Sequence, residues 1–95
     1  MITEVRIYTM KPGRLDDFLD VFRTGIVPTS EAYGIHIQGA WRNDDKNELV
    51  WVRSYADKAT LEVYENCPER ALYSPKSSDC LESLEVRTVE NVLED

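Results

Sequence analysis

Apolar and polar residues alternate along the first ten positions of the chain. One side of this run carries Val5, Ile7 and Thr9, and the other carries Glu4, Arg6 and Tyr8. A repeat of two residues is the period of a β-strand, so residues 2–10 are predicted to be extended. Pro12 and Gly13 end the strand.

The spacing of apolar residues changes after the Pro-Gly pair and predicts a helix. The apolar positions are Leu15, Phe18, Leu19, Phe22 and Ile26. They draw a single stripe along an α-helix, which is typical of a helix packed on a core. Pro28 is expected to kink or interrupt this helix, and Gly34 is a natural stop after Tyr33.

The middle of the chain predicts a hairpin followed by a shorter helix. Residues 35–42 and 48–55 both have extended patterns, and the polar cluster 43–47 between them is typical of a turn. Asp57 is expected to cap a second helix that continues to about Asn66.

The last third of the chain is less regular. Pro68 and Pro75 bracket a segment predicted to be irregular or to form one helical turn. The run 81–93 has apolar positions that would also suit a helix, but its density of Val and Thr favours a strand.

The resulting order is strand, helix, strand, strand, helix, strand. This βαββαβ order is the ferredoxin-like α+β arrangement, in which a four-stranded antiparallel sheet carries both helices on one face. The predicted domain occupies residues 1–95. The other sheet face is left open, and it either meets solvent or meets the same face of a second copy.

Charged residues are expected on the open face, because burying an unpaired charge costs on the order of several kcal/mol. Trp41 then falls on the helix side, as part of the core. The predicted open face comprises Glu4, Arg6, Tyr8, His36, Gln38, Ala40, Arg42, Trp51, Arg53 and Tyr55, with Glu85, Arg87 and Val89 from the last strand. Large aromatics beside arginines are unusual on a plain solvent surface, so enclosure by a second subunit is the favoured explanation.

Composition limits the classes of partner. The chain has 95 residues, 11 Lys and Arg, 18 Asp and Glu, and a net charge of −7. An acidic chain with scattered basic residues is a poor nucleic-acid binder, and no apolar run is long enough to span a membrane. The start of the chain lacks the layout of a signal peptide, and Cys67 and Cys80 are expected to be reduced thiols, so a cytoplasmic protein is predicted.

Candidate chemistry lies on the predicted open face. The candidate catalytic residues are His36, Tyr8 and Arg6, and the candidate ligand-binding residues are Glu4, Arg6, Tyr8, His36, Gln38, Trp51, Arg53, Tyr55 and Arg87. Alternatives stay open: Glu4 and Arg6 as a self-satisfied ion-pair ladder, His36 as a surface histidine, and Tyr8 as packing. No metal site and no cofactor are expected; haem would find only His36 as an axial ligand.

Several motifs resemble those of the NIPSNAP-like family. They are Glu4-x-Arg6-x-Tyr8-Thr9-x-x-Pro12-Gly13, Gly39-x-Trp41, and an aromatic strand ending at Tyr55. The resemblance implies a dimeric α+β barrel, in which two open sheet faces close around a shared cavity. After the second helix the family often shows an acidic-Pro-Glu-Trp-like stretch, and here the sequence departs from it with Cys67-Pro68-Glu69-Arg70.

The predicted function is therefore a small cytosolic homodimer that binds an aromatic or anionic molecule in the barrel. Fold analogy within the wider superfamily also allows monooxygenase-like or acid-base activity, and whether the chain is an enzyme stays open. The alternative is a non-catalytic interaction or structural module whose barrel is filled by its own side chains.

Overall fold

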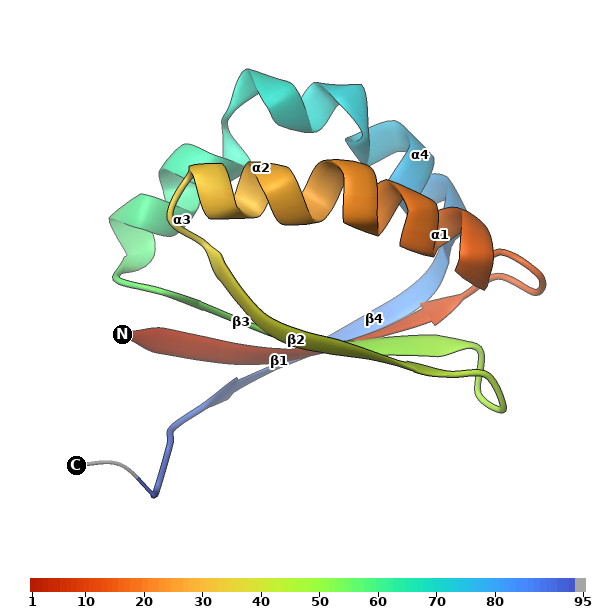
Figure 1. Cartoon of the computed structure of the whole chain (residues 1–95), viewed down its shortest axis with the longest axis horizontal. Helices are drawn as coiled ribbons and strands as arrows, with labels where there is room; N and C mark the ends of the chain where they lie inside the picture. The colour runs from red at the N-terminus through yellow and green to blue at the C-terminus, as the bar shows by residue number, and fades with distance from the viewer. Residues whose placement is uncertain (94–95) are drawn as a thin grey trace.

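The chain folds into one antiparallel sheet with helices on one of its faces (Figure 1). The computed structural model describes residues 1–93. In chain order the elements are β1 (Ile2–Met10), α1 (Leu15–Val21), the π-helical turn η1 (Phe22–Ile26), α2 (Val27–Ala32), β2 (His36–Asn43), β3 (Glu48–Tyr55), α3 (Lys58–Glu65), the 3-10 helix η2 (Pro68–Leu72), α4 (Ser74–Cys80) and β4 (Leu81–Val89). The strand order β2-β3-β1-β4 confirms the predicted ferredoxin-like α+β fold.

The first predicted helix is confirmed as a run of three helical segments. All five stripe residues are buried, as the spacing predicted. The helix is interrupted just before Pro28 by η1, and Pro28 itself lies in the first turn of α2, where its missing N–H costs little. Gly34 ends the helix with a φ of +83°, a conformation that favours glycine.

The second predicted helix is also confirmed, whereas the segment after it is more helical than expected. Asp57 caps α3 by accepting a hydrogen bond from the Thr60 backbone N–H at 2.8 Å. Residues 68–72 form η2, and α4 then starts with Pro75 in its first turn. The serine-rich sequence of α4 gives little helical signal, and burial of Tyr73 and Cys80 at its two ends ties it to the core.

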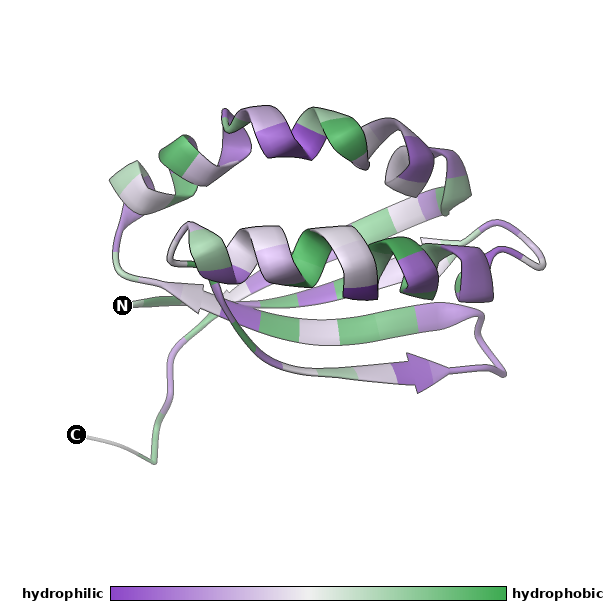
Figure 2. Ribbon diagram, turned by 45° about the horizontal axis from the view of Figure 1, so that its top comes forward, coloured by the Kyte–Doolittle hydropathy of each residue, from purple (hydrophilic) through white to green (hydrophobic). Residues whose placement is uncertain are grey.

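The strand prediction for the last run is confirmed over residues 81–89, and residues 90–93 lie outside the strand. Along the chain, hydrophobic and hydrophilic residues alternate in the strands and helices, and the turn between β2 and β3 is hydrophilic (Figure 2). None of the helices among the described residues has the length and apolar character needed to cross a bilayer.

The predicted assignment of residues to the two sheet faces is wrong. The faces are reversed in β1 and β3: Glu4 (7% exposed), Arg53 (6%) and Trp51 (1%) are buried beneath the helices. Val5, Ile7, Val50 and Val52 lie on the opposite face, and Trp41 is 59% exposed there rather than in the core. In β4 the register places Arg87 beside Val5 on the open face.

Two physical reasons explain the reversal. The expectation treated each charge as unpaired, but the buried charges of β1 and β3 neutralise one another. The aromatic stripe of the first helix also needs large partners, and Trp51 supplies one: its ring lies 5.1 Å from that of Phe22. If the other face of β1 and β3 met the helices, its smaller β-branched side chains would not fill the space that Trp51 occupies.

Candidate functional site

Glu4 is the centre of a buried hydrogen-bond network on the helix side of the sheet. Its Oε1 accepts bonds from Arg6 Nη1 at 2.6 Å and from Arg53 Nε at 2.8 Å, and its Oε2 accepts one from the Tyr55 hydroxyl at 2.6 Å. The sheet register explains this gathering: Arg53 is directly opposite Glu4, while Arg6 and Tyr55 are two positions along the two strands. Four polar side chains therefore converge from two central strands.

The network fixes the charge state of its members. Burial alone opposes ionisation of Glu4, but the hydrogen bonds from Tyr55, Arg53 and Arg6 outweigh it, so the pKa of Glu4 lies below its usual value of 4.5. Burial and then the bond to the Glu4 carboxylate raise the pKa of Tyr55 to about 12. At neutral pH Glu4 is therefore a carboxylate that accepts hydrogen bonds from these three donors.

Trp51 forms the floor between the two arginines. The Arg6 and Arg53 guanidinium carbons lie 5.6 and 5.8 Å from its ring centroid, within the range of cation-π attraction. Tyr8 meets the same ring edge to face at 5.5 Å. The indole Nε1 of Trp51 is buried and has no hydrogen-bond acceptor among residues 1–93.

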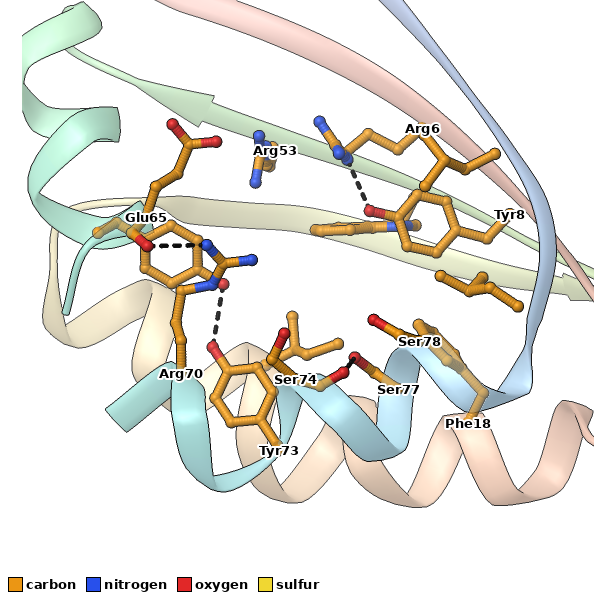
Figure 3. Close-up of a pocket in the computed structure, with 15 residues that line it drawn as sticks. Arg6, Tyr8, Phe18, Arg53, Glu65, Arg70, Tyr73, Ser74, Ser77 and Ser78 are labelled. Atoms are coloured by element: carbon orange, nitrogen blue, oxygen red, sulfur yellow. Dashed lines mark hydrogen bonds between the residues drawn. The ribbon is translucent and has the colours of Figure 1, made fainter. Parts of the chain in front are cut away.

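A cavity of about 200 Å³ lies between this part of the sheet and the segment formed by η2 and α4. Arg6 and Arg53 reach it from the strands, and Arg70 reaches it from η2 on the opposite wall (Figure 3). Arg70 donates from Nη1 to the Glu65 backbone carbonyl at 3.0 Å, whereas its Nε is buried without an acceptor among the described residues. Guanidinium groups therefore reach the cavity from two walls.

The remaining lining divides into an apolar part and a hydroxyl-bearing part. The apolar and aromatic lining comes from Phe18, Ile26, Leu81 and Leu84, and hydroxyl groups come from Tyr8, Tyr64, Tyr73, Ser74, Ser77 and Ser78. Burial and then a bond to Tyr64 raise the pKa of Tyr73, so its hydroxyl stays protonated at neutral pH. Among residues 1–93, Glu65 is the only carboxylate in the lining, so this site is cationic within an acidic chain.

The structure brings together six of the nine predicted ligand-binding residues. The residues that line the cavity are Arg6, Tyr8, Trp51 and Arg53. Glu4 accepts hydrogen bonds from both arginines, and Tyr55 donates to Glu4. They gather inside one chain, between sheet and helices, rather than in a cavity shared across the open face.

The other three predicted residues lie on the open face and do not reach this cavity. His36 is an exposed residue whose Nδ1 lies 3.3 Å from a Glu31 carboxylate oxygen. Gln38 donates to the Ser54 hydroxyl at 3.1 Å, and Arg87 pairs with Glu85 at 2.6 Å. His36 therefore stands apart from the other two candidate catalytic residues, Arg6 and Tyr8.

Sequence reasoning missed the wall built by η2 and α4. Arg70 and Tyr73 lie in the segment expected to be irregular, where no periodicity indicated which side chains face inward. One signal was present: a Cβ on Gly25 would come 2.9 Å from the Tyr73 ring, so the glycine gives that ring room against the first helix. Arg70 also occupies the position at which the sequence departs from the family's aromatic pattern.

The fold and the cavity define a class: a ferredoxin-like α+β domain with a pocket between one sheet face and its helices. The sequence model of the NIPSNAP family matches residues 3–89. This chain belongs to the NIPSNAP family.

Solved structures share the whole fold. An uncharacterised NIPSNAP domain protein from Burkholderia xenovorans superposes with a TM-score of 0.86 at 22% identity, over 97% of this chain and 95% of that one. A protein from Agrobacterium tumefaciens superposes with a TM-score of 0.85 at 19% identity, over 95% of this chain and 92% of that one. A Bacteroides thetaiotaomicron protein provisionally named an antibiotic biosynthesis monooxygenase gives 0.82 at 17%, over 96% and 89%.

Among the curated proteins none matches the sequence. These three structural likenesses are below 25% identity, so they establish the fold and leave the chemistry to be argued from the site.

Proposed function

We propose that this protein binds a small aromatic or anionic molecule in the cavity between the sheet and the helices. The observation that carries the proposal is a cavity of about 200 Å³ lined by Arg6, Arg53 and Arg70, where Arg53 donates to Glu4 through Nε and Arg70 donates to the Glu65 carbonyl through Nη1. The guanidinium nitrogens that these bonds leave over can donate to an acceptor on a ligand.

The test is a fragment screen by ligand-observed NMR, using neutral and anionic single-ring compounds. Ser78→Trp places a large side chain into the cavity from α4, and Lys76→Trp is the matched control because Lys76 is exposed on the same helix and does not line the cavity. Binding that is lost in Ser78→Trp and kept in Lys76→Trp supports the proposal. Binding equal in both variants contradicts it.

An oxygen-dependent reaction on the bound molecule is the second candidate function. It is favoured by the structural likeness to a protein provisionally named a monooxygenase and by the Tyr8 hydroxyl at the cavity, which accepts a bond from Arg6 Nε at 3.0 Å. Glu4 is a poor proton acceptor because three donors occupy it, and His36 is remote. Oxygen uptake is expected in the presence of cavity ligands and should be lost in Tyr8→Phe. If no bound ligand causes oxygen uptake, the reaction is contradicted and only the binding function stands.

We also propose that two copies pair through their open sheet faces. Val5, Ile7, Val50 and Val52 form an apolar strip there, and Trp41 adds an exposed indole. Sedimentation equilibrium should show a dimer that Trp41→Ser weakens, because the substitution removes the largest apolar side chain of the face. A wild-type monomer at micromolar concentration would contradict the pairing.

A further inference from the structure

We infer that the cavity ligand is an aromatic monocarboxylate, with its carboxylate held between Arg53 and Arg70. The inference rests on the proposed binding function and adds the chemical class of the ligand. It follows from three properties of the site: the donors that remain free, the net charge of the lining, and the size of the apolar part.

The free donors point to an oxyanion. Arg53 uses only Nε for Glu4 and Arg70 uses only Nη1 for the Glu65 carbonyl, so terminal nitrogens of both side chains remain for a ligand. The two side chains come from opposite walls of the cavity (Figure 3). Planar guanidinium groups match the geometry of a carboxylate, which can accept from both.

The charge of the site matches one negative charge. Three arginines line the cavity, while Glu4 and Glu65 supply two carboxylates, which leaves one positive charge unbalanced. A monoanion completes this balance. A dianion would instead bring one uncompensated charge beside the buried Trp51 and Phe18, where such a charge is costly.

The size and lining of the rest of the cavity match a single aromatic ring. A volume of about 200 Å³ lies below the roughly 300 Å³ at which pockets for drug-sized molecules begin, and a cavity of about 150 Å³ already accepts benzene. Phe18, Leu81 and Leu84 give this part an apolar surface, and the rings of Tyr8 and Tyr73 adjoin it. One substituted ring with one carboxylate fits these limits.

The experiment measures binding of benzoate to the full-length protein at pH 7 by isothermal titration calorimetry or by NMR shift titration. Benzamide is the neutral isostere, cyclohexanecarboxylate keeps the charge without the aromatic ring, and terephthalate and phenyl phosphate carry a second charge. Benzoate is expected to bind most tightly of the five, because only it combines a single charge with a flat ring.

Arg70→Gln tests the position of the carboxylate, since Arg70 takes no part in the Glu4 network that holds the strands. The substitution is expected to weaken the binding of benzoate by about tenfold or more and to leave the affinity for benzamide unchanged. Arg23→Gln, on the exposed side of the first helix, is the control and should change neither ligand.

Several results would overturn the inference while leaving the binding function intact. They are benzamide or cyclohexanecarboxylate binding as tightly as benzoate, a dianion binding more tightly, or an equal loss of benzoate and benzamide in Arg70→Gln. Failure of the binding function itself gives a different pattern, in which no single-ring fragment distinguishes Ser78→Trp from Lys76→Trp.

Discussion

The buried Glu4 network yields the most quantitative prediction. Glu4→Gln keeps the size of the side chain and removes its charge, which leaves Arg6 and Arg53 without their counter-ion. Their side chains are only 14% and 8% exposed. Water can therefore do little to compensate, and the free energy of unfolding should fall sharply.

The magnitude follows from the contacts. Removing one partner of a buried ion pair costs about 3–5 kcal/mol, because the remaining charge stays buried. A domain of this length has a total stability of roughly 5–14 kcal/mol, so the loss is a large fraction of the whole. With a shift of about 4–8 °C for each kcal/mol, the midpoint of thermal unfolding should fall by at least about 12 °C.

The assay is urea unfolding followed by circular dichroism, at a fixed protein concentration because dimerisation would change the apparent stability. Glu85→Gln is the matched control: Glu85 pairs with Arg87 at 2.6 Å on β4, but both side chains are 58% exposed. That variant should lose less than about 1 kcal/mol. Equal losses in the two variants would refute the claim that burial makes the Glu4 network strong.

The difference in unfolding free energy between the wild type and Glu4→Gln should depend on pH, and the pKa of Glu4 gives the sign of this dependence. The folded pKa of Glu4 lies below its ordinary value of 4.5, so the stabilisation by ionised Glu4 is fully present above pH 4.5 and is lost as pH falls through the folded pKa. The difference in unfolding free energy between wild type and Glu4→Gln should be constant from pH 7 to about pH 5 and shrink below that. A difference that grows on acidification would show that the carboxylate is not held ionised.

Three further predictions concern local geometry. Gly25→Ala should destabilise the fold by about 1–3 kcal/mol, because its Cβ would lie 2.9 Å from the Tyr73 ring; in a Tyr73→Leu background the cost should fall, and an unchanged cost would contradict that contact. Gly39→Ala should weaken dimerisation in sedimentation experiments, since its Cβ would come 2.6 Å from Trp41 Cη2 and displace the indole, whereas Ala40→Ser serves as the neighbouring control. Asp57→Ala should lower the free energy of unfolding by removing the cap of α3, and Asp45→Ala, in the β2–β3 turn, should lower it less.

The fold could be predicted from the sequence because its signals are local. The period of two in residues 2–10, the helical stripe beginning at Leu15 and the polar turn 43–47 each depend on neighbours a few positions apart. Gly34 and Asp57 mark helix ends through their own backbone and side-chain chemistry. The motif from Glu4 to Gly13 indicated the NIPSNAP family, and the family match over residues 3–89 confirms it.

The location of the site could not be predicted in the same way, because alternation shows that a strand has two faces without showing which one the helices cover. The cost of burying Glu4, Arg6 and Arg53 depends on whether they meet one another, and only strand pairing decides that. The sequence alone therefore determined the secondary-structure elements, their order, and which side chains are able to bind a ligand or take part in a reaction. The tertiary structure decided which of those residues share a cavity, added Arg70 from a segment without periodicity, and placed His36 elsewhere, because these outcomes depend on contacts between residues far apart in the chain.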